Sequence, residues 1–152
     1  MNKNYWLLKS EPDTFSIDDL KKNKREVWSG VRNYQARNMM RDLMQVGDIC
    51  FFYHSSCEVP VIVGTCRVAK TKVIDPTQFD IKNEYFDPKS KKENPTWICV
   101  EVDFVEKFEK IITLSEIKNQ KKLSNMRLVQ PGSRLSVQPV TEKEYLEILK
   151  LL

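Results

Sequence analysis

Residues 48–54 read DICFFYH, a short run dense in aromatic side chains. Runs of four to eight such residues are typical of β-strands, and this one carries enough apolar surface to be buried. In a strand, Phe51 and Tyr53 point to one side, and Phe52 and His54 point to the other. We therefore expect a buried strand here, and the rest of the fold is built outward from it.

Other segments show the same strand character. The run VIVGTCRV at 61–68 is β-branched, and WICVEVDF at 97–104 alternates in the period of two that marks a half-buried strand. In the latter, Ile98, Val100, Val102 and Phe104 share one face. Two shorter strands are expected at 5–9 and 134–137. The connections between strands are short, which favours a mainly antiparallel sheet.

Helices are predicted from their capping signals. A hydroxyl residue followed three positions later by an acid occurs at Ser16, Thr113 and Thr141, and each pattern matches a capping box. A fourth helix is expected over 33–43, with an apolar stripe formed by Ala36, Met39, Met40 and Leu43. Strands and helices do not alternate strictly, so we predict an α+β fold with a curled sheet and helices at its margins.

The stretch 74–95 is the only long irregular segment. It contains Asp75-Pro76, Asp87-Pro88 and Asn94-Pro95, and the residue before a proline avoids the helical conformation. Its apolar side chains, among them Phe79 and Phe86, predict a loop pinned by aromatic residues rather than a domain boundary. We therefore expect residues 1–152 to form a single domain, a size that suits one hydrophobic core.

The net charge of +4 is mildly basic and unevenly distributed. Residues 1–44 and 111–152 each carry an excess of basic side chains, whereas 45–110 carry a small acidic excess. If the two ends meet, they form one basic face that attracts phosphate backbones. The alternative is that these lysines are ordinary solvated side chains. No apolar run is long enough for a membrane span or a secretory signal, so we expect an intracellular protein, cytoplasmic or, in a eukaryote, nuclear.

The cysteines and the single histidine do not predict a metal site. Cys50, Cys57, Cys66 and Cys99 contain no C-x-x-C pair, and only His54 could join them, so we expect no metal and no other cofactor. In a reducing compartment these cysteines behave as small apolar residues. Walker, G-x-G-x-x-G, H-E-x-x-H and G-x-S-x-G motifs are absent, which argues against the corresponding nucleotide, metalloprotease and serine-hydrolase chemistries.

The segment WSGVRNY at 28–34 is the richest in binding chemistry. Asn33 can cap the following helix, whose N-terminus offers free N–H groups to a phosphate or an oxygen-rich edge. Gly30 permits close approach of the backbone. Trp28 offers a face on which a base can stack, worth ~1–3 kcal/mol. The alternative is a purely structural segment: a core tryptophan, a turn glycine and a cap.

Three further positions carry polar chemistry near strand ends. His54 can hydrogen-bond a ligand or act as a general base, or it can be a structural histidine bonded to backbone. Arg134 and Ser136 alternate with apolar residues, and a guanidinium there can clamp a phosphate or a carbonyl edge. Ser10 follows the first strand and is as well explained by a turn as by a ligand contact.

Six ordered motifs resemble the EVE domain family. They are KSEP at 9–12, WSGVRNYQARN at 28–38, VGD at 46–48, FYHS at 52–55, PTW at 95–97 and SRLSVQP at 133–139. The resemblance covers almost the whole chain. It implies a PUA-like fold, a small curled β-barrel with helices around it, and kinship with domains that bind RNA or modified bases. It also implies a reader of modified bases, with modified cytosine in DNA among the ligands, and attaches no catalytic activity.

Chemistry and resemblance together predict a non-catalytic domain that accepts one flipped, modified base from DNA or RNA. Flipping costs a few kcal/mol, which stacking and edge hydrogen bonds can offset. The expected pocket residues are Ser10, Trp28, Val31, Arg32, Asn33, Tyr34, His54, Trp97, Arg134 and Ser136, with Arg37 and Arg41 on the phosphates. The partner is nucleic acid and not a membrane; the oligomeric state is open, with a monomer expected.

Two other functions fit the sequence less well. One is an enzyme acting on a modified nucleotide, with His54 as base and Ser10, Ser55 or a cysteine as nucleophile. No acid stands beside this histidine in the sequence. The other is a protein-interaction module, which would present an exposed apolar patch of several hundred Å², roughly the size at which such patches become functional.

Overall fold

The computed structural model describes residues 4–132 and 134–152. Six strands and four α-helices are joined by shorter helical turns. The strands are β1 (Tyr5–Ser10), β2 (Arg25–Val27), β3 (Ile49–His54), β4 (Val61–Ile74), β5 (Ile98–Thr113) and β6 (Val137–Val140). The α-helices are α1 (Ile17–Asn23), α2 (Tyr34–Asn38), α3 (Leu114–Lys118) and α4 (Glu142–Leu149).

The strands form one sheet in the order β2-β5-β4-β3-β1-β6. All neighbouring pairs are antiparallel except β1 and β3, which run parallel with Tyr5 opposite Ile49. The predicted α+β fold with a curled, mainly antiparallel sheet is confirmed. Among the described strands no pairing joins β2 to β6, so the curled sheet is open at that seam and is not a closed barrel.

Strand β3 is buried on both faces. Along β3, Cys50 and Phe52 belong to one apolar core, which also contains Trp28. Phe51 and Tyr53 belong to a second core on the opposite face. The alternation expected from residues 48–54 is therefore confirmed, and it explains why this strand contains so few polar side chains. Helices α1 and α2 contribute to the first core, and α3 and α4 to the second.

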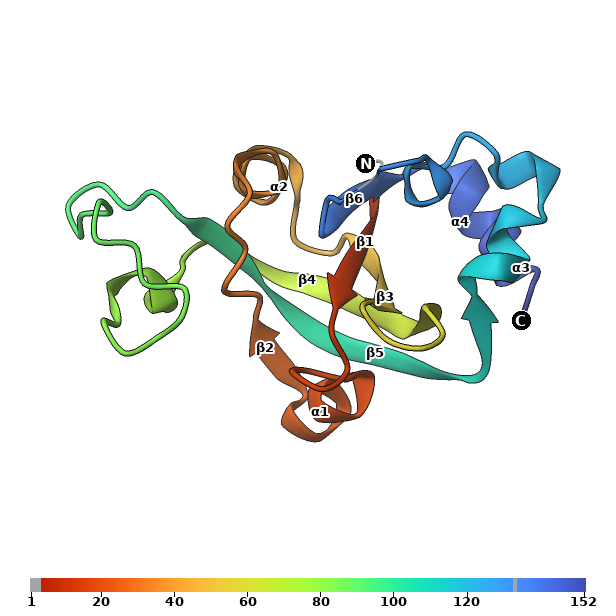
Figure 1. Ribbon diagram of the computed structural model, residues 1–152, viewed down its shortest axis with the longest axis horizontal. Helices are drawn as coiled ribbons and strands as arrows, with labels where there is room; N and C mark the ends of the chain where they lie inside the picture. Colours follow the sequence, from red (N-terminus) through yellow and green to blue (C-terminus); the bar gives the residue numbers. More distant parts are fainter. Residues whose placement is uncertain (1–3, 133) are drawn as a thin grey trace.

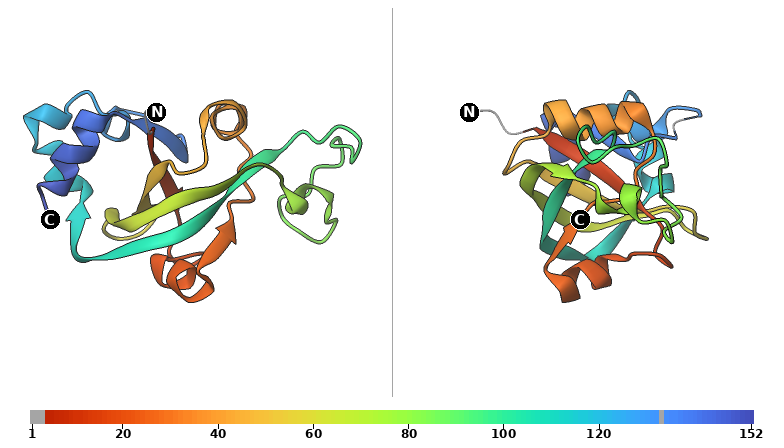
Figure 2. Two further views of the ribbon diagram at one scale, coloured as in Figure 1. Left: turned by 180° about the vertical axis from the view of Figure 1, so that it is seen from behind. Right: turned by 90° about the vertical axis from the view of Figure 1, so that its left-hand side faces the viewer.

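Strands β4 and β5 form a long twisted ribbon through the molecule (Figure 1). The loop that joins them projects at one end, and α3 and α4 lie at the other, as the view from behind also shows (Figure 2). Four register shifts interrupt the β4–β5 pairing. Two of them insert extra residues into β5 between Phe104 and Ile112, which is why the alternation in the sequence ended at 104 although β5 continues to Thr113.

The three predicted capping boxes are confirmed at Ser16, Thr113 and Thr141. The helix predicted over 33–43 begins as expected, because the Asn33 side chain accepts a hydrogen bond from the Ala36 N–H. It then widens into a π-helical turn over Met39–Leu43.

The π-turn changes which side chains of this helix are buried. Ala36 and Met40 are buried as predicted, but Leu43 is 55% exposed and Met44 is buried in its place. The placement of Leu43 on the apolar stripe was therefore wrong. A π-turn inserts one residue into the helical repeat, so the next buried position moves on by one.

Two strands at the edges of the sheet differ from expectation. β2 was not predicted, because three residues are too few to show a period. The strand expected at 134–137 lies instead at Val137–Val140 and includes Pro139. Proline is tolerated here because β6 is an edge strand, where the missing N–H is not needed on the outer side.

The long loop is held by polar residues as well as by its aromatic side chains. Gln78 is fully buried and donates to the carbonyl oxygens of Asp75 and Trp97, while its own amide oxygen accepts from the Trp97 N–H. Tyr85 is 37% exposed, and Ile81 is 77% exposed. Phe79 and Phe86 are partly buried, so the expected pinning by aromatic side chains is present in part, and satisfied buried hydrogen bonds add to it.

Cys50, Cys66 and Cys99 are buried, as expected of small apolar residues, and Cys57 is partly exposed. Within residues 4–132 and 134–152, no helix combines the length and apolar character that a membrane crossing requires.

Candidate ligand-binding pocket

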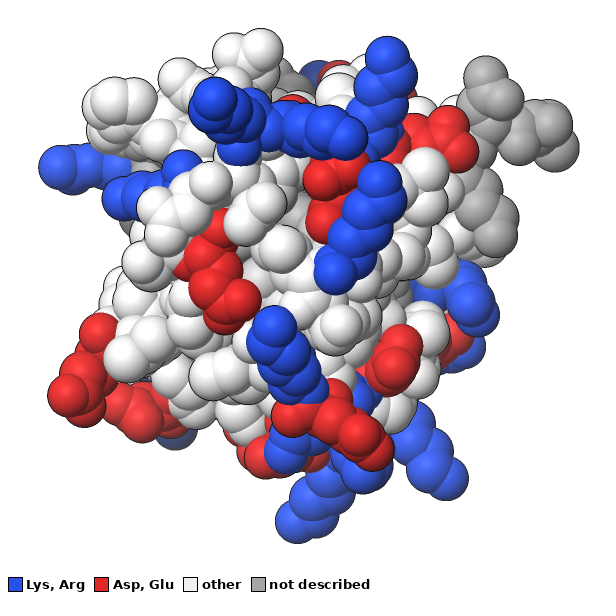
Figure 3. Space-filling model, turned by 90° about the vertical axis from the view of Figure 1, so that its right-hand side faces the viewer, with Lys and Arg blue, Asp and Glu red and all other residues white. Residues whose placement is uncertain are grey.

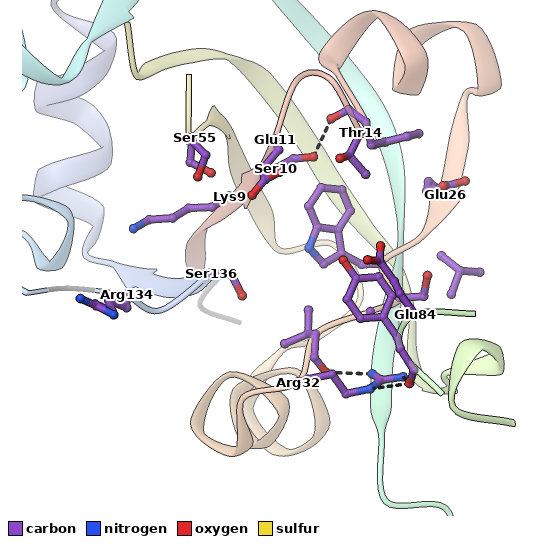
Figure 4. A pocket seen from close by; sticks show the side chains of 18 residues that line it. Lys9, Ser10, Glu11, Thr14, Glu26, Arg32, Ser55, Glu84, Arg134 and Ser136 are labelled. Carbon is purple, nitrogen blue, oxygen red and sulfur yellow. Dashed lines mark hydrogen bonds between the residues drawn. The ribbon is translucent and has the colours of Figure 1, made fainter. Parts of the chain in front are cut away.

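A pocket of about 830 Å³ opens beside the end of β1 (Figure 4). This volume falls in the range of roughly 300–1,000 Å³ that is usual for ligand sites. Five chain segments that are distant in sequence line it: Lys9, Ser10, Glu11, Thr14 and Phe15; residues 26–32; Ser55 and Ser56; Glu84 and Tyr85; and Arg134 and Ser136.

Trp28 belongs to the pocket wall and to the core at once. The backbone N–H of Trp28 donates to the Val100 carbonyl oxygen 2.8 Å away, and this bond continues the β2–β5 pairing by one residue. The indole ring meets the Phe52 ring edge-on at 5.6 Å and the Phe15 ring at 6.2 Å. Only 7% of the residue is exposed. The ring is therefore held rigidly, with one small part of its surface toward the pocket.

Gly30 shapes the next part of the wall. Its φ of +84° lies in the left-handed region, which other residues adopt only at a cost. A Cβ atom there would stand 2.8 Å from the Tyr85 ring, so the loop can approach this closely only because residue 30 is glycine. The Gly30 N–H donates to a carboxylate oxygen of Asp75 at 2.8 Å.

The buried Asp75 carboxylate organises this side of the pocket. One oxygen accepts from the Gly30 N–H and from Arg32 at 3.0 Å; the other accepts from the N–H and hydroxyl of Thr77. Burial alone would raise the pKa of Asp75, but the hydrogen bonds from Thr77, Gly30 and Arg32 together lower it below its ordinary value. The carboxylate is therefore a charged, fully partnered anchor.

All five N–H groups of the Arg32 guanidinium are in use. They donate to Asp75, to the hydroxyl of Thr77 and to the carbonyl oxygens of Val31 and Tyr85, the last through two N–H groups. The guanidinium also lies over the Trp97 ring, 4.9 Å from its centroid. In this arrangement Arg32 connects the wall to the long loop and has no N–H left for a phosphate.

The pocket has two electrostatically different sides. Figure 4 shows Lys9 and Arg134 on one side and Glu26 and Glu84 on the other, with Glu11 beside Ser10. No acid forms an ion pair with Lys9 or Arg134 among the described residues. Burial lowers the pKa of the Lys9 ammonium. An anionic group of a ligand is therefore best accommodated between Lys9 and Arg134.

Half of the predicted site residues line this pocket: Ser10, Trp28, Val31, Arg32, Arg134 and Ser136. The Ser10 hydroxyl donates to the Phe15 carbonyl, so in this arrangement it can only accept from a ligand. His54 lies outside the lining, and its Nε2 accepts from the Ile17 N–H at 3.1 Å. Burial is the main cause of a lowered pKa at His54.

Four of the remaining predicted residues form a cluster around the start of α2 that adjoins Arg32 but does not line the pocket: Asn33, Tyr34, Arg37 and Trp97. Tyr34 is 60% exposed and stacks on Trp97 with ring centroids 4.9 Å apart. Arg37 lies over Tyr34 and donates to the Thr96 carbonyl. Asn33 caps the helix. Arg41 forms an ion pair with its neighbour Asp42 on the surface.

Several lining residues were not singled out from the sequence. Lys9 stands next to Ser10 in the KSEP motif, so the motif itself was the available signal. Tyr85 reaches the pocket only through the fold of the long loop. Glu26 lies on the short strand β2, which no periodicity predicted.

The surface away from the pocket carries mixed charge. Figure 3 shows the end that bears α3 and α4, where basic and acidic side chains are interspersed. Lys122 and Lys150 both approach Glu147 there, and Lys110 approaches Glu116. In the described part of the chain, no group of three His, Cys, Asp or Glu side chains is arranged to hold a metal ion.

Comparison with known proteins identifies related chains. The model of the EVE domain matches residues 4–151. Thymocyte nuclear protein 1 of Gallus gallus is 45% identical over 166 residues, covering 97% of this chain and 68% of that protein. The Homo sapiens protein of the same name is 41% identical, covering 97% of this chain and 73% of that protein.

Solved structures agree with this relationship. A protein from Leishmania major superimposes with a TM-score of 0.94 at 48% identity, covering 99% of this chain and 94% of that chain. Human THYN1 in complex with 5-methylcytosine-containing DNA superimposes with a TM-score of 0.92 at 40% identity, covering 98% and 97% of the two chains.

Proposed function

This chain belongs to the EVE domain family, and we propose that it binds DNA and reads a modified cytosine in the pocket between Lys9 and Tyr85. The observation that carries the proposal is the similarity, over nearly the whole of both chains, to human THYN1 in its complex with 5-methylcytosine-containing DNA. The pocket has the volume and the aromatic wall that a flipped nucleotide requires, and its Lys9 and Arg134 form no ion pair among the described residues.

The base would enter beside the rigid Trp28 ring, with its phosphate toward Lys9 and Arg134. Packing a base on Trp28 costs little further side-chain entropy, because neighbouring residues already hold the ring. Ser10 and Ser136 supply hydroxyl groups that can meet the edge or sugar of the nucleotide. Arg32 acts indirectly, by holding the Gly30 turn against the long loop.

We propose that the domain is not catalytic. His54, the only histidine, uses its Nε2 lone pair to accept the Ile17 N–H, and a general base needs that lone pair free. Among the described residues no carboxylate forms an ion pair with His54. Turnover of a modified nucleoside that disappears in His54→Ala would favour the enzyme instead.

Three further properties remain proposals. We propose that residues 1–152 form one EVE domain and that it acts as a monomer. The matched vertebrate relatives are named thymocyte nuclear protein 1, which favours a nuclear location if this chain comes from a eukaryote and leaves the cytoplasmic expectation open otherwise. RNA, the other partner expected from the sequence, serves as a comparison ligand below.

Equilibrium binding to fluorescent duplexes tests the proposal. The duplexes carry one central cytosine, 5-methylcytosine or 5-hydroxymethylcytosine, and a matched RNA duplex is included, each at two salt concentrations. We expect tighter binding to one modified DNA, retained at the higher salt. Equal and steeply salt-dependent binding to every ligand would contradict base reading, because it would reflect phosphate attraction alone.

Trp28→Phe tests the role of the aromatic wall. A smaller ring keeps most of the core packing but offers less stacking surface, so the preference for the modified duplex should fall about fivefold, since base stacking is worth ~1–3 kcal/mol. Trp97→Phe is the comparison for the α2 cluster, because Trp97 packs on Tyr34 and Arg32 and does not line the pocket. Loss of the preference in Trp97→Phe alone would move the binding site to the α2 cluster.

A further inference from the structure

Glu26 occupies an unusual position for an acidic side chain. It is the middle residue of β2, opposite Val102, and Val102 is buried in the core. Side chains two residues apart on a strand point to the same side, and the pairing continues through the Trp28 N–H, so Glu26 and Trp28 lie on the same face. Both residues line the pocket.

Glu26 is a partly exposed residue. Among the described residues its side chain makes no hydrogen bond or ion pair. Of the cations that line the pocket, Arg32 is paired with Asp75, and Lys9 and Arg134 lie on the far side. Burial, and secondarily the charge of Asp19, raise the pKa of Glu26. A partly desolvated acid without a donor is unfavourable unless a ligand supplies one.

We propose that the Glu26 carboxylate accepts a hydrogen bond from the exocyclic amino group of the bound base, and that this contact makes the pocket select cytosine-type bases over thymine. The inference rests on the proposed function of the pocket. 5-Methylcytosine and thymine have nearly the same shape and the same methyl group. They differ in having an amino group or a carbonyl oxygen at C4, and a carboxylate accepts from the former and repels the latter.

Glu26→Gln separates this role from a structural one. Glutamine has the same shape but carries both a donor and an acceptor, so it can face either base. The probes are duplexes with 5-methylcytosine or thymine at one position. Each of these bases stands opposite an abasic site, so neither has to break a base pair before it enters the pocket. The assays are run at pH 8, far above the ordinary pKa of a glutamate side chain, which is about 4.3.

We expect the wild type to prefer 5-methylcytosine over thymine by about tenfold or more, in line with the discrimination that one good polar contact provides. In Glu26→Gln the ratio should fall to within about threefold, mainly because thymine binds better. Glu109→Gln, an exposed position on β5, removes the same charge and should leave the ratio unchanged. An unchanged ratio in Glu26→Gln overturns the proposal.

Glu84→Gln tests the other carboxyl on that side of the pocket. If Glu84→Gln and not Glu26→Gln abolishes the discrimination, the assignment to Glu26 is overturned. If the wild type prefers 5-methylcytosine over cytosine but Glu26→Gln changes nothing, only the Glu26 contact fails. If the wild type prefers no base at all, the proposed function fails with it. Glu26→Gln should unfold at the same denaturant concentration as the wild type, because the wild-type carboxyl makes no hydrogen bond or ion pair among the described residues.

Discussion

At the scale of single residues, the candidate site depends on one buried acid that does not itself face the ligand. Asp75 connects the Gly30 turn, Arg32 and the start of the long loop. Its side chain is 2% exposed, and that of Arg32 is 21% exposed. Removing one member of a buried pair costs more than the pair contributes, because the other charge is left without a partner.

Asp75→Asn should therefore lower the free energy of unfolding by about 2–3 kcal/mol at neutral pH, in the range of charged hydrogen bonds. A carboxyl whose pKa is lower in the folded state stabilises the fold above its ordinary pKa. That contribution disappears as the pH falls through the folded-state value. The difference between wild type and variant should thus be constant above about pH 4 and shrink below it. Urea unfolding at pH 7 and near pH 3 measures this.

Asp42→Asn provides the matched control for this prediction. Asp42 forms its ion pair with Arg41 in an exposed position, and exposed pairs contribute little because water screens them. We expect a much smaller loss of stability than in Asp75→Asn. Equal losses in the two variants would mean that Asp75 is not the anchor of this network.

At the scale of elements, the helix after Asn33 shows how a local irregularity reassigns the core. A regular α-helix over 33–43 would bury Leu43. The π-turn over Met39–Leu43, closed by the bond from the Met44 N–H to the Met39 carbonyl, buries Met44 instead. Met44 then packs in the core that contains Trp28. The turn thus links helix geometry to the wall of the pocket.

Met44→Ala and Leu43→Ala test this register directly. Met44 is 4% exposed, so its truncation should leave a cavity and cost about 2–3 kcal/mol of stability. Leu43 is more than half exposed, and its truncation should change stability by no more than about 0.5 kcal/mol. Chemical denaturation of both variants decides between the two registers. A larger loss at Leu43 would mean that the helix is regular.

At the scale of the whole molecule, the two basic ends of the chain meet. Strand β6 pairs with β1, and this pairing brings Arg134, just before β6, to the same side of the pocket as Lys9, near the end of β1. One basic face was expected if the two basic ends of the chain meet, and they meet at the pocket. The surface at the α3–α4 end, in contrast, carries paired charges. Phosphate attraction is expected to concentrate at the pocket rather than over the entire surface.

Arg134→Gln should reduce the salt dependence of DNA binding as well as its strength. Each phosphate contact contributes about 0.9 to the slope of log affinity against log salt, so the loss of one should make the slope shallower by about that amount. Lys122→Gln is the control, because Lys122 approaches Glu147 away from the pocket. The measurement is a salt titration of DNA binding. Equal slopes for wild type and Arg134→Gln would place the phosphates elsewhere.

Features that depend on neighbouring residues were predictable from the sequence. The strand at 48–54 follows from an aromatic-rich run of seven residues, and the caps at Ser16, Thr113 and Thr141 follow from four-residue patterns. The α+β class follows from the order of such elements. Half of the expected site residues lie in the pocket, because the family motifs that named them include both β1 and the segment at 28–38.

Features that depend on long-range contacts become visible only in the folded chain. The partnering of Asp75 with Gly30 and Arg32 joins residues more than 40 positions apart. The inward position of Glu26 follows from its pairing with β5, which three residues cannot reveal on their own. The burial of Met44 depends on an inserted helical residue. In each case the free energy comes from groups that meet only after folding, so no local pattern records it.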